Sequence, residues 1–545
     1  MPGLRAQMKR DRCQIAVIGS GFAGSLAALV AHRLGFSTML IERGRHPRFV
    51  IGESSTPLAN LLLEEIAEEY RLPFLRPLSK WGAWQRELPH IGCGLKRGFT
   101  FYQHQFDQPF GPDPRRLRQL LVGASPNEAV ADTHWYRPDF DSYLVERAKA
   151  FGVDYREETN LTSVIEETDG LRLSGTDRNG QVIEIATEFV IDATGPRGFL
   201  HRALQLPERA LPSFPATQAL YSHFTGVGDL SAEFLETQFE LPYPPEQAAV
   251  HHVFPGGWIW VLKFNNGISS AGVAATDVVA KELRLSESEP AWRRLLSRLP
   301  SLQTMFKSSR AIVPFIHAPR LSFQSGAVVG SRWALLPYAA GFVDPLLSTG
   351  FSLSLLGITR IGNALKHRWG KSEFCKSLET YAAITTLELE ASARLVGALY
   401  ASMNRFELFF DLSLLYFAAA IYSETARRLG KPKLADSFLL CRHPEVGPQL
   451  RRLCEAVTNP GHQAPSATEL SRQIHALIKP FDLAGLTDAS RRPWYPARAD
   501  DLLVNAHKVG ATEQEVREML RRCGLDHTHK ENIASRLKVG GLGYG

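Results

Sequence analysis

The chain has 545 residues, of which 44% are hydrophobic and 22% are charged, a composition typical of a soluble globular protein with two or three domains. Its formal net charge of +6 is small for this length, and no basic run is interleaved with aromatic residues, so a nucleic-acid partner is not expected. The six cysteines include no C-x-x-C pair, which argues against a metal site and favours reduced thiols in the cytoplasm.

The first predicted element is a buried strand that starts at Ile15 and leads through Gly19-x-Gly21-x-x-Gly24 into a helix. In this pattern the first glycine permits the tight turn, the second lets the backbone approach a pyrophosphate, and the third allows close packing of helix and strand. The helix N-terminal amides then bind the phosphate charge. A second strand ends at Glu42, at the spacing expected for a carboxylate that binds the adenosine ribose. The sequence therefore predicts a bound dinucleotide.

Two later segments are expected to join the same sheet. One is the strand that ends in Asp192-Ala193-Thr194-Gly195, and the other is the apolar run at 333–336, before a helix that starts near Thr349. Between the three segments, period-two alternation at 98–105, 170–185 and 249–273 predicts further strands. The turn sequences Pro-Gly-Gly and Asn-Asn-Gly within the last stretch predict hairpins.

We therefore expect an α/β fold, with a Rossmann-type dinucleotide-binding domain over residues 1–365 and a β-rich substrate region inserted at about 80–110 and 205–320. From about Gly362 the pattern is helical, and region 366–545 is expected to cover the substrate site. Its longest apolar stretch, 406–422, contains Glu407 and Asp411, which predicts a buried helix rather than a membrane span.

The sequence contains one convincing glycine-rich turn. The glycines at 541–545 are not followed by a helix, so a second dinucleotide site for NADPH is not expected. The bound dinucleotide is accordingly predicted to be FAD, with its reduced form supplied by a separate flavin reductase.

Five further motifs point to a particular family of flavoproteins. They are Gly52-Glu53-Ser54, Arg137-Pro138-Asp139-Phe140-Asp141-Ser142-Tyr143-Leu144, Asp192-Ala193-Thr194-Gly195, Trp258-x-Trp260, and Phe342-x-x-Pro345-x-x-Ser348-x-Gly350. Together with the first glycine turn they resemble the flavin-dependent halogenases, which share their fold with FAD monooxygenases and geranylgeranyl reductases. The resemblance covers 14–350 and continues more loosely to 429. It implies FAD contacts at Gly19, Gly21, Phe22, Ala23, Gly24, Glu42, Arg43, Gly52, Ser54, Arg137, Asp192, Gly195, Asp344 and Pro345.

The resemblance also implies a reaction. In that family a flavin C4a-hydroperoxide is attacked by chloride or bromide, and the hypohalous acid that forms reaches a lysine beside an electron-rich aromatic substrate, which can be carrier-protein-bound. The family pattern, a lysine before a glycine and an aromatic-rich strand, is matched to Lys80. That lysine would hold the oxidant by a hydrogen bond or as a haloamine. The halide is expected at the amides of Thr349 and Gly350, because a helix N-terminus binds anions.

The sequence departs from the family at three places. Leu262 and Lys263 replace the Ile-Pro that follows the second tryptophan, and Leu336-Pro337 stands where a Gly-Asp pair usually contacts the flavin. Leu347 replaces a glutamate of tryptophan-specific members, which favours a phenol, a pyrrole or another electron-rich ring.

These departures leave alternatives open. Trp258 and Trp260 are expected on one face of a strand, where they are either the halogenase motif or a packed core pair. The neighbouring His251-His252 pair is predicted to lie on the sheet surface. The function is either that of a halogenase, of a related FAD oxidoreductase such as a hydroxylase or double-bond reductase, or of a flavin-binding scaffold without turnover.

Overall fold

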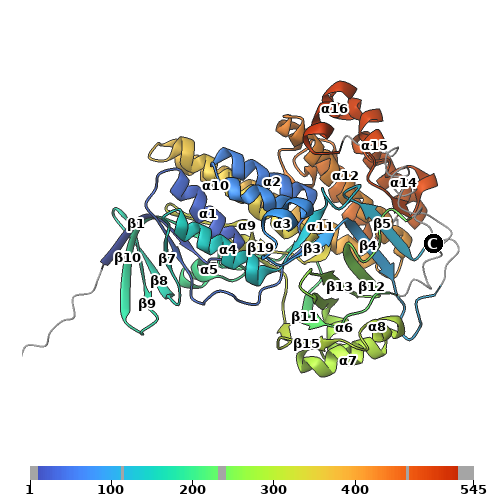
Figure 1. Cartoon of the computed structure of the whole chain (residues 1–545), viewed down its shortest axis with the longest axis horizontal. Helices are drawn as coiled ribbons and strands as arrows, with labels where there is room; N and C mark the ends of the chain where they lie inside the picture. The colour runs from blue at the N-terminus through green and yellow to red at the C-terminus, as the bar shows by residue number, and fades with distance from the viewer. Residues whose placement is uncertain (1–9, 112–115, 231–240, 462–464, 526–545) are drawn as a thin grey trace, which may run out of the picture.

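The computed structural model describes residues 10–111, 116–230, 241–461 and 465–525. The glycine-rich tail at 541–545 lies outside the described residues. Two large sheets and a group of long helices organise the chain (Figure 1).

The first sheet has seven strands in the order β7-β2-β1-β10-β9-β8, with β18 also paired to β10. Strands β7, β2, β1, β10 and β18 run parallel, whereas β9 pairs antiparallel with both β10 and β8. The predicted union of the three nucleotide-binding segments in one sheet is confirmed. The strands are β1 (Arg10–Ile18), β2 (Thr38–Ile41), β7 (Asp154–Arg156), β8 (Asn160–Glu167), β9 (Gly170–Thr176), β10 (Val182–Asp192) and β18 (Trp333–Leu335).

Helices cover this sheet because its central parallel strands are apolar on both faces. All four residues of β2 are buried, and α1 packs against β1, β2 and β10. Helices α4 and α10 in turn pack against α1, and α2 packs against α10. These helices are α1 (Phe22–Arg33), α2 (Pro57–Glu69), α4 (Arg137–Ala150), α5 (Phe199–Ala203) and α10 (Thr349–Arg368).

The second sheet has nine strands in the order β15-β11-β14-β13-β12-β4-β5-β20, with β16 paired to β11. The predicted hairpins β12–β13 and β13–β14 are present. The stretch at 170–185, in contrast, extends the first sheet as β9 and part of β10. The strands are β4 (Gly98–Gln103), β5 (Gln119–Gly123), β11 (Thr217–Thr225), β12 (Ala249–Phe254), β13 (Gly257–Lys263), β14 (Ile268–Thr276), β15 (Arg310–Ala311), β16 (Ile316–Ala318) and β20 (Trp494–Tyr495).

Both faces of the second sheet are covered. Phe99 and Phe101 on one face pack against aromatic rings of α12 (Phe406–Arg428). On the other face Ile259 and Val261 belong to a separate core with residues of α7 and α8. Figure 1 shows α6, α7 and α8 on this second side. The elements there are α6 (Asp277–Glu282), η3 (Leu285–Glu287), α7 (Glu289–Ser297) and α8 (Pro300–Met305).

Short elements connect the two sheets. Strand β3 pairs with β6, and β17 pairs with β19. Their bounds, with the neighbouring helices, are η1 (Pro73–Ser79), α3 (Trp81–Glu87), β3 (Cys93–Lys96), β6 (Asp132–Trp135), β17 (Phe323–Gln324), α9 (Pro337–Ala340), β19 (Gly341–Phe342) and η4 (Leu346–Ser348).

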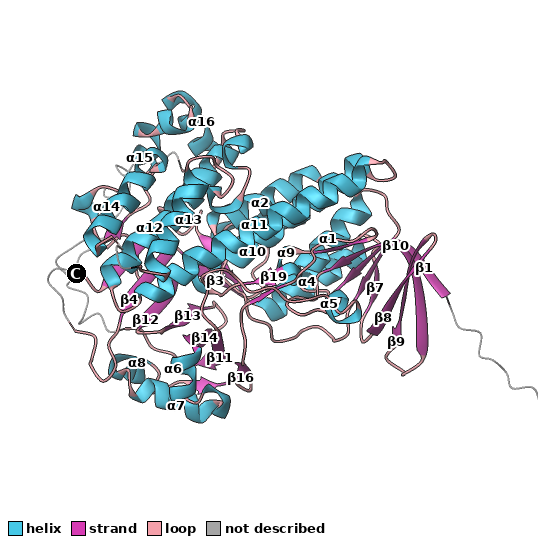
Figure 2. Cartoon of the chain, turned by 180° about the vertical axis from the view of Figure 1, so that it is seen from behind, coloured by secondary structure: helices cyan, strands magenta, loops and turns pink. Residues whose placement is uncertain are grey.

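The region after α10 is mainly helical, as expected, and it gathers over the end of the molecule that holds β4 and β12 (Figure 2). Within the described residues α12 alone is long and apolar enough to cross a membrane, but 83% of its most apolar window is buried inside the protein. A capping box formed by Thr512 and Glu515 opens α16. The elements are α11 (Glu373–Ser402), α12, η5 (Pro432–Ala435), η6 (Phe438–Leu440), α13 (Val446–Thr458), α14 (Ala467–Ile478), η7 (Lys479–Phe481), η8 (Ala489–Arg491), α15 (Ala499–Val504), η9 (Ala506–Val509) and α16 (Glu513–Arg522).

Candidate active site

A cavity of about 370 Å³ is lined by residues of both large sheets. The β1–α1 turn and the end of β2 come from the first sheet, and β12 and β13 come from the second. The segment 338–351 closes it. Most residues predicted from the motifs line this cavity: Gly19, Gly21, Phe22, Ala23, Glu42, Arg43, Gly52, Ser54, Arg137, Gly195, Trp258, Trp260, Phe342, Asp344, Pro345, Ser348, Thr349 and Gly350.

The glycine turn has the backbone geometry that a dinucleotide requires. Gly19 has φ +94°, and a Cβ there would lie 2.8 Å from the Ala193 carbonyl oxygen. A Cβ on Gly24 would lie 1.8 Å from the Gly19 carbonyl oxygen, so this glycine allows α1 to pack on the strand and lies outside the cavity lining. Gly21 is the N-cap of α1 and makes no side-chain cap, which leaves the first-turn amides available to a phosphate. The turn fits a dinucleotide phosphate.

Glu42 lies at the end of β2 with a 2% exposed side chain. Its carboxylate accepts hydrogen bonds from the Ser20 amide (2.9 Å) and the Gly44 amide (2.8 Å), and it pairs with Arg48 at 3.0 Å. Burial by itself raises the pKa of Glu42, but Arg48 and these donors outweigh burial and lower it. Glu42 is therefore an ionised acceptor at the edge of the cavity.

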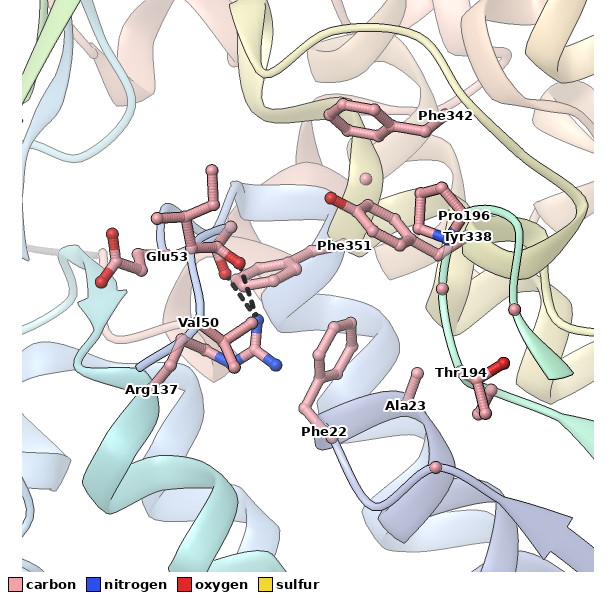
Figure 3. A pocket seen from close by; sticks show the side chains of 18 of the residues that line it. Phe22, Ala23, Val50, Glu53, Arg137, Thr194, Pro196, Tyr338, Phe342 and Phe351 are labelled. Atoms are coloured by element: carbon pink, nitrogen blue, oxygen red, sulfur yellow. Dashed lines mark hydrogen bonds between the residues drawn. The ribbon is translucent and has the colours of Figure 1, made fainter. Parts of the chain in front are cut away.

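The loop at 50–54 crosses the cavity and is fixed by Arg137. The guanidinium forms a buried bidentate pair with Asp141 (2.8 and 2.7 Å) and donates to the Gly52 carbonyl oxygen at 2.9 Å (Figure 3). The next residue of the loop, Glu53, pairs with His223 of β11 at 2.7 Å. The loop is thus tied to the first sheet through α4 and to the second sheet through β11.

Asp192, predicted to contact the cofactor, lies outside the cavity lining. It is fully buried, and it accepts hydrogen bonds from the Thr194 amide (2.8 Å) and the Leu200 amide (2.6 Å). These bonds hold the turn in which Gly195, at φ +82°, reaches the cavity. The side chain therefore supports the turn that faces the site.

The departure at Leu336-Pro337 has a structural counterpart that sequence reasoning missed. Pro337 is the first residue of α9, and the next residue, Tyr338, lines the cavity. Figure 3 shows the Tyr338 ring beside Phe342, and their ring centroids lie 5.0 Å apart. An aromatic ring is therefore present one residue beyond the position of the missing carboxylate.

The turn before α10 holds two residues in the left-handed region, Leu347 (φ 67°) and Ser348 (φ 54°). Ser348 is the N-cap of α10 and makes no side-chain cap to the helix amides. Thr349 and Gly350 thus begin a 20-residue helix at the wall of the cavity. An uncapped helix N-terminus at this place can accept a small anion. Leu347 is fully buried and lies outside the cavity lining.

The two tryptophans of β13 lie on the same face, with ring centroids 5.6 Å apart, and both line the cavity. The prediction that His251-His252 lies on the sheet surface is wrong. Both histidines are buried, and the His251 ring stacks on Trp258 (5.2 Å) and on Phe101 (4.5 Å). Burial lowers the pKa of His251 to about 3, so the ring is neutral.

The expected aromatic-rich strand after Lys80 is also wrong, because Lys80 is instead the N-cap of helix α3. This helix forms because Trp84 is fully buried against Phe140, and because Gly82 lies so close to the loop that a Cβ would be 2.7 Å from the Ala129 carbonyl oxygen. Lys80 is half-buried and lies outside the cavity lining.

The lysine that precedes a glycine and an aromatic strand is Lys96, the last residue of β3. Lys96 is the one fully buried lysine in the described part of the chain. Its ammonium donates to the Ser54 hydroxyl of the cavity wall at 2.9 Å and lies 3.8 Å above the Phe99 ring. Burial lowers the pKa of Lys96 to about 7, partly opposed by the Asp132 carboxylate. A buried amine of this kind can donate a hydrogen bond when it is protonated and can act as a nucleophile when it is neutral.

Comparison with known proteins agrees with this site. The model of the family described as FAD dependent oxidoreductase matches residues 14–330, more than half of the chain. The tetracycline 7-halogenase of Kitasatospora aureofaciens is 26% identical over 93% of this chain and 94% of its own. The monodechloroaminopyrrolnitrin halogenase PrnC of Pseudomonas fluorescens is 28% identical over 72% of this chain and 69% of its own.

A solved structure shows the same fold. It is the halogenase PltM in complex with phloroglucinol and FAD, with a TM-score of 0.75 at 22% identity, covering 89% of this chain and all of that one. The family model covers more than half of the chain, including the glycine turn and both tryptophans, and it ends before the segment 338–351. The chain therefore belongs to the FAD-dependent oxidoreductase family, and flavin-dependent halogenases are its relatives within it.

Proposed function

We propose that this protein is an FADH2-dependent halogenase that halogenates an electron-rich aromatic substrate. The observation that carries the proposal is that one cavity is lined by the glycine turn, by Trp258 and Trp260, and by the helix start at Thr349 and Gly350. Reduced FAD bound there would, with dioxygen as the oxidant, supply the two-electron oxidation of halide to hypohalous acid.

The halide, chloride or bromide, binds at the N-terminus of α10. The left-handed turn through Leu347 and Ser348 leaves this end of the helix without a side-chain cap. The dipole of the helix favours a negative charge there, and no cationic side chain is needed. Neutral His251 adds no competing positive charge elsewhere on the cavity wall.

Trp258, Trp260 and Leu262 alternate along β13 and form one apolar wall of the cavity. Such a wall limits the access of water to an oxidant held beside it. Leu262, which departs from the family pattern, preserves the apolar character at its position. The Trp-x-Trp segment supports the halogenase proposal in this way, even though it is also well packed.

Lys96, rather than Lys80, holds the oxidant beside the substrate. Its amine reaches the cavity wall through Ser54, donates to the Ser55 carbonyl oxygen at 2.5 Å, and lies over the Phe99 ring. That ring packs against Tyr416 and Phe417 of α12, with centroids 6.2 and 5.2 Å away. The helical C-terminal region thus covers the side of Lys96 that faces away from the flavin cavity, and we infer that the aromatic substrate binds there.

The partners follow from the same proposal. The sequence has one dinucleotide turn, so a separate flavin reductase supplies the reduced cofactor. The substrate is a small aromatic compound, free or carrier-protein-bound, with a phenol as the first class to test. The six cysteines are all free, which fits an enzyme of the cytoplasm.

Mass spectrometry of reaction products tests the function. The protein is incubated with FAD, a flavin reductase, NADH, bromide or chloride, and a panel of phenols, indoles and pyrroles. Lys96→Met removes the amine but keeps a similar length, and Lys80→Met is the matched control. We expect halogenated product from the parent and from Lys80→Met, and a loss of about a hundredfold or more in Lys96→Met.

Two outcomes would contradict the proposal. Hydroxylated or reduced products without any halogenated product from the parent would identify a related oxidoreductase. Equal halogenation by Lys96→Met and the parent would show that Lys96 takes no part in the reaction and that another residue holds the oxidant.

A further inference from the structure

Three buried side chains form a hydrogen-bonded chain from the helical region into the cavity. The indole N–H of Trp258 donates to the Tyr400 hydroxyl oxygen at 3.1 Å, and the Tyr400 hydroxyl donates to Asp344 Oδ2 at 2.9 Å. The other carboxylate oxygen, Asp344 Oδ1, accepts from the Leu346 amide at 3.0 Å. Trp258 and Asp344 line the cavity, whereas Tyr400 contacts them from α11 and lies outside the cavity lining.

The donors and acceptors of this chain all find partners when Asp344 is ionised. In that state the indole N–H, the Tyr400 hydroxyl and the Leu346 amide each have one acceptor, and no buried donor lacks a partner. A proton on Asp344 Oδ2 directed at Tyr400 would bring two O–H groups into the contact between these side chains, so protonation there changes the contact. The hydroxyl of Tyr400 is therefore the group that connects the ionisation of Asp344 to the position of Trp258.

Asp344 also begins the turn on which the halide site depends. It directly precedes Pro345, and the turn then passes through the left-handed residues Leu347 and Ser348 to the start of α10. Asp344, Pro345, Ser348 and the first residues of the helix line the same cavity. A carboxylate charge at this place repels a halide ion, because the site is closed from bulk water on the sides formed by Asp344 and Trp258, which are 2% and 1% exposed.

We propose that Tyr400 is a positioning residue that couples halide binding to the ionisation of Asp344 and fixes the indole of Trp258 at the same time. This inference rests on the proposed halide site at the start of α10. The groups that face Asp344 are the Tyr400 hydroxyl of α11, the Trp258 indole of β13 and the Leu346 amide of its own turn, and no charged side chain is among them.

The geometry gives the coupling a direction. Burial raises the pKa of Asp344 to about 7, and the donors from Leu346, Tyr400 and Trp258 oppose this rise. Halide affinity therefore falls as the pH rises through the titration of Asp344. Removal of the Tyr400 hydroxyl takes away one stabilising donor, so Asp344 ionises at a higher pH and the loss of halide affinity moves with it.

The experiment compares Tyr400→Phe with Tyr381→Phe. Tyr381 is a buried tyrosine of the same helix whose hydroxyl donates to the Leu335 carbonyl oxygen and lies outside the cavity lining. Infrared difference spectra of the whole protein follow the Asp344 carboxyl, identified as the band that is lost in Asp344→Asn. Chlorine NMR line broadening follows chloride binding over the same pH range, without turnover.

In the parent and in Tyr381→Phe, we expect chloride affinity to fall by about tenfold as the Asp344 carboxyl ionises. In Tyr400→Phe, both the infrared midpoint and the loss of chloride affinity should move to higher pH by about one pH unit. In Asp344→Asn, chloride affinity should not depend on pH in this range, which also tests the coupling if Tyr400→Phe does not fold.

The two readouts separate the possible failures. An infrared midpoint that is the same in the parent and in Tyr400→Phe overturns the positioning role of Tyr400. A shifted infrared midpoint together with pH-independent chloride binding overturns the coupling to halide. Absence of chloride binding in every variant places the failure in the proposed halide site, and the infrared titration still decides the contact between Tyr400 and Asp344.

Discussion

At the scale of single residues, a substitution of Gly21 should weaken cofactor binding without preventing folding. Its backbone is at φ −63°, which any residue adopts, and an added Cβ would lie 3.4 Å from the Arg137 guanidinium, an ordinary van der Waals contact. We expect Gly21→Val to fold but to bind FAD about a hundredfold more weakly, because its branched side chain occupies the space that the pyrophosphate needs. Absorbance of the protein after dialysis measures the bound flavin.

A contrasting substitution in the same turn makes this test sharper. Gly24→Ala places a Cβ 1.8 Å from the Gly19 carbonyl oxygen, so that variant should lose stability as well as cofactor. If Gly21→Val keeps FAD as tightly as the parent, the glycine turn is not the pyrophosphate site.

Lys96 predicts a pH dependence that distinguishes its two possible roles. Its pKa is lowered to about 7, first by burial, so the amine becomes neutral as the pH rises through that value. If the lysine takes the halogen as a haloamine, the yield of halogenated product per flavin oxidised should increase across neutral pH at saturating halide. A yield that decreases over this range would instead support an ammonium that holds the oxidant by a hydrogen bond. Lys96→Arg stays protonated and should give a low yield at every pH.

The limits of sequence reasoning are clear at this scale. The Gly19-x-Gly21-x-x-Gly24 turn was predictable because its conformation depends on neighbouring residues. His251 was misplaced because alternation identifies the two faces of a strand but not what covers them, and here α12 covers one face and α7 and α8 the other. The burial of Lys96 could not be predicted for a similar reason, since it depends on strands that are distant in sequence.

At the scale of elements, Asp411 of α12 joins three parts of the C-terminal region. Its buried carboxylate accepts hydrogen bonds from Ser471 (2.5 Å) and His475 (3.0 Å) of α14 and from Arg492 (2.8 Å). Asp411→Ala should lower the free energy of unfolding by about 3 kcal/mol, because the half-buried Arg492 loses its partner. Chemical denaturation measures the change.

The Asp411 carboxylate also makes the free energy of unfolding depend on pH in the acid range. Burial raises the pKa of Asp411, but His475, Ser471 and Arg492 outweigh burial and lower it below the ordinary value. Its contribution is therefore present above the pKa of the unfolded chain and is lost as the pH falls through the lower pKa of the folded protein. Asp411→Asn should remove this acid-dependent part, whereas Glu146→Gln, which breaks an exposed pair with Lys149, should leave the profile unchanged. An identical acid profile in Asp411→Asn and the parent would contradict the assignment.

The elements themselves were predicted well where the signal is local. The β12–β13–β14 hairpins follow from their turn sequences, and α10 begins at Thr349 as expected. Which sheet a strand joins was less accessible, because pairing depends on partners far along the chain. The stretch at 170–185 was predicted as strand without a sheet assignment, and it extends the first sheet. The contact between Tyr400 and Asp344 could not be predicted, since no local pattern joins residues on separate elements.

At the scale of the whole molecule, the sequence offers one dinucleotide turn, and bound FAD would leave no second turn for NADPH. We expect NADPH alone to reduce the bound FAD slowly and incompletely, and a separate flavin reductase to restore rapid turnover. Stopped-flow absorbance of the flavin, with and without the reductase, measures the difference. Rapid and stoichiometric bleaching by NADPH in a reductase-free preparation would contradict the prediction and favour a hydroxylase.

The pairing of β20 with β5 has a consequence for how the protein is made. Leu121 and Trp494 are partners in one sheet, yet most of the chain is synthesised between them. Until the ribosome has released that late segment, β5 presents an open strand edge, which can pair with other chains. We therefore expect a chain terminated before β20 to aggregate more readily than the full chain, because its β5 edge stays open.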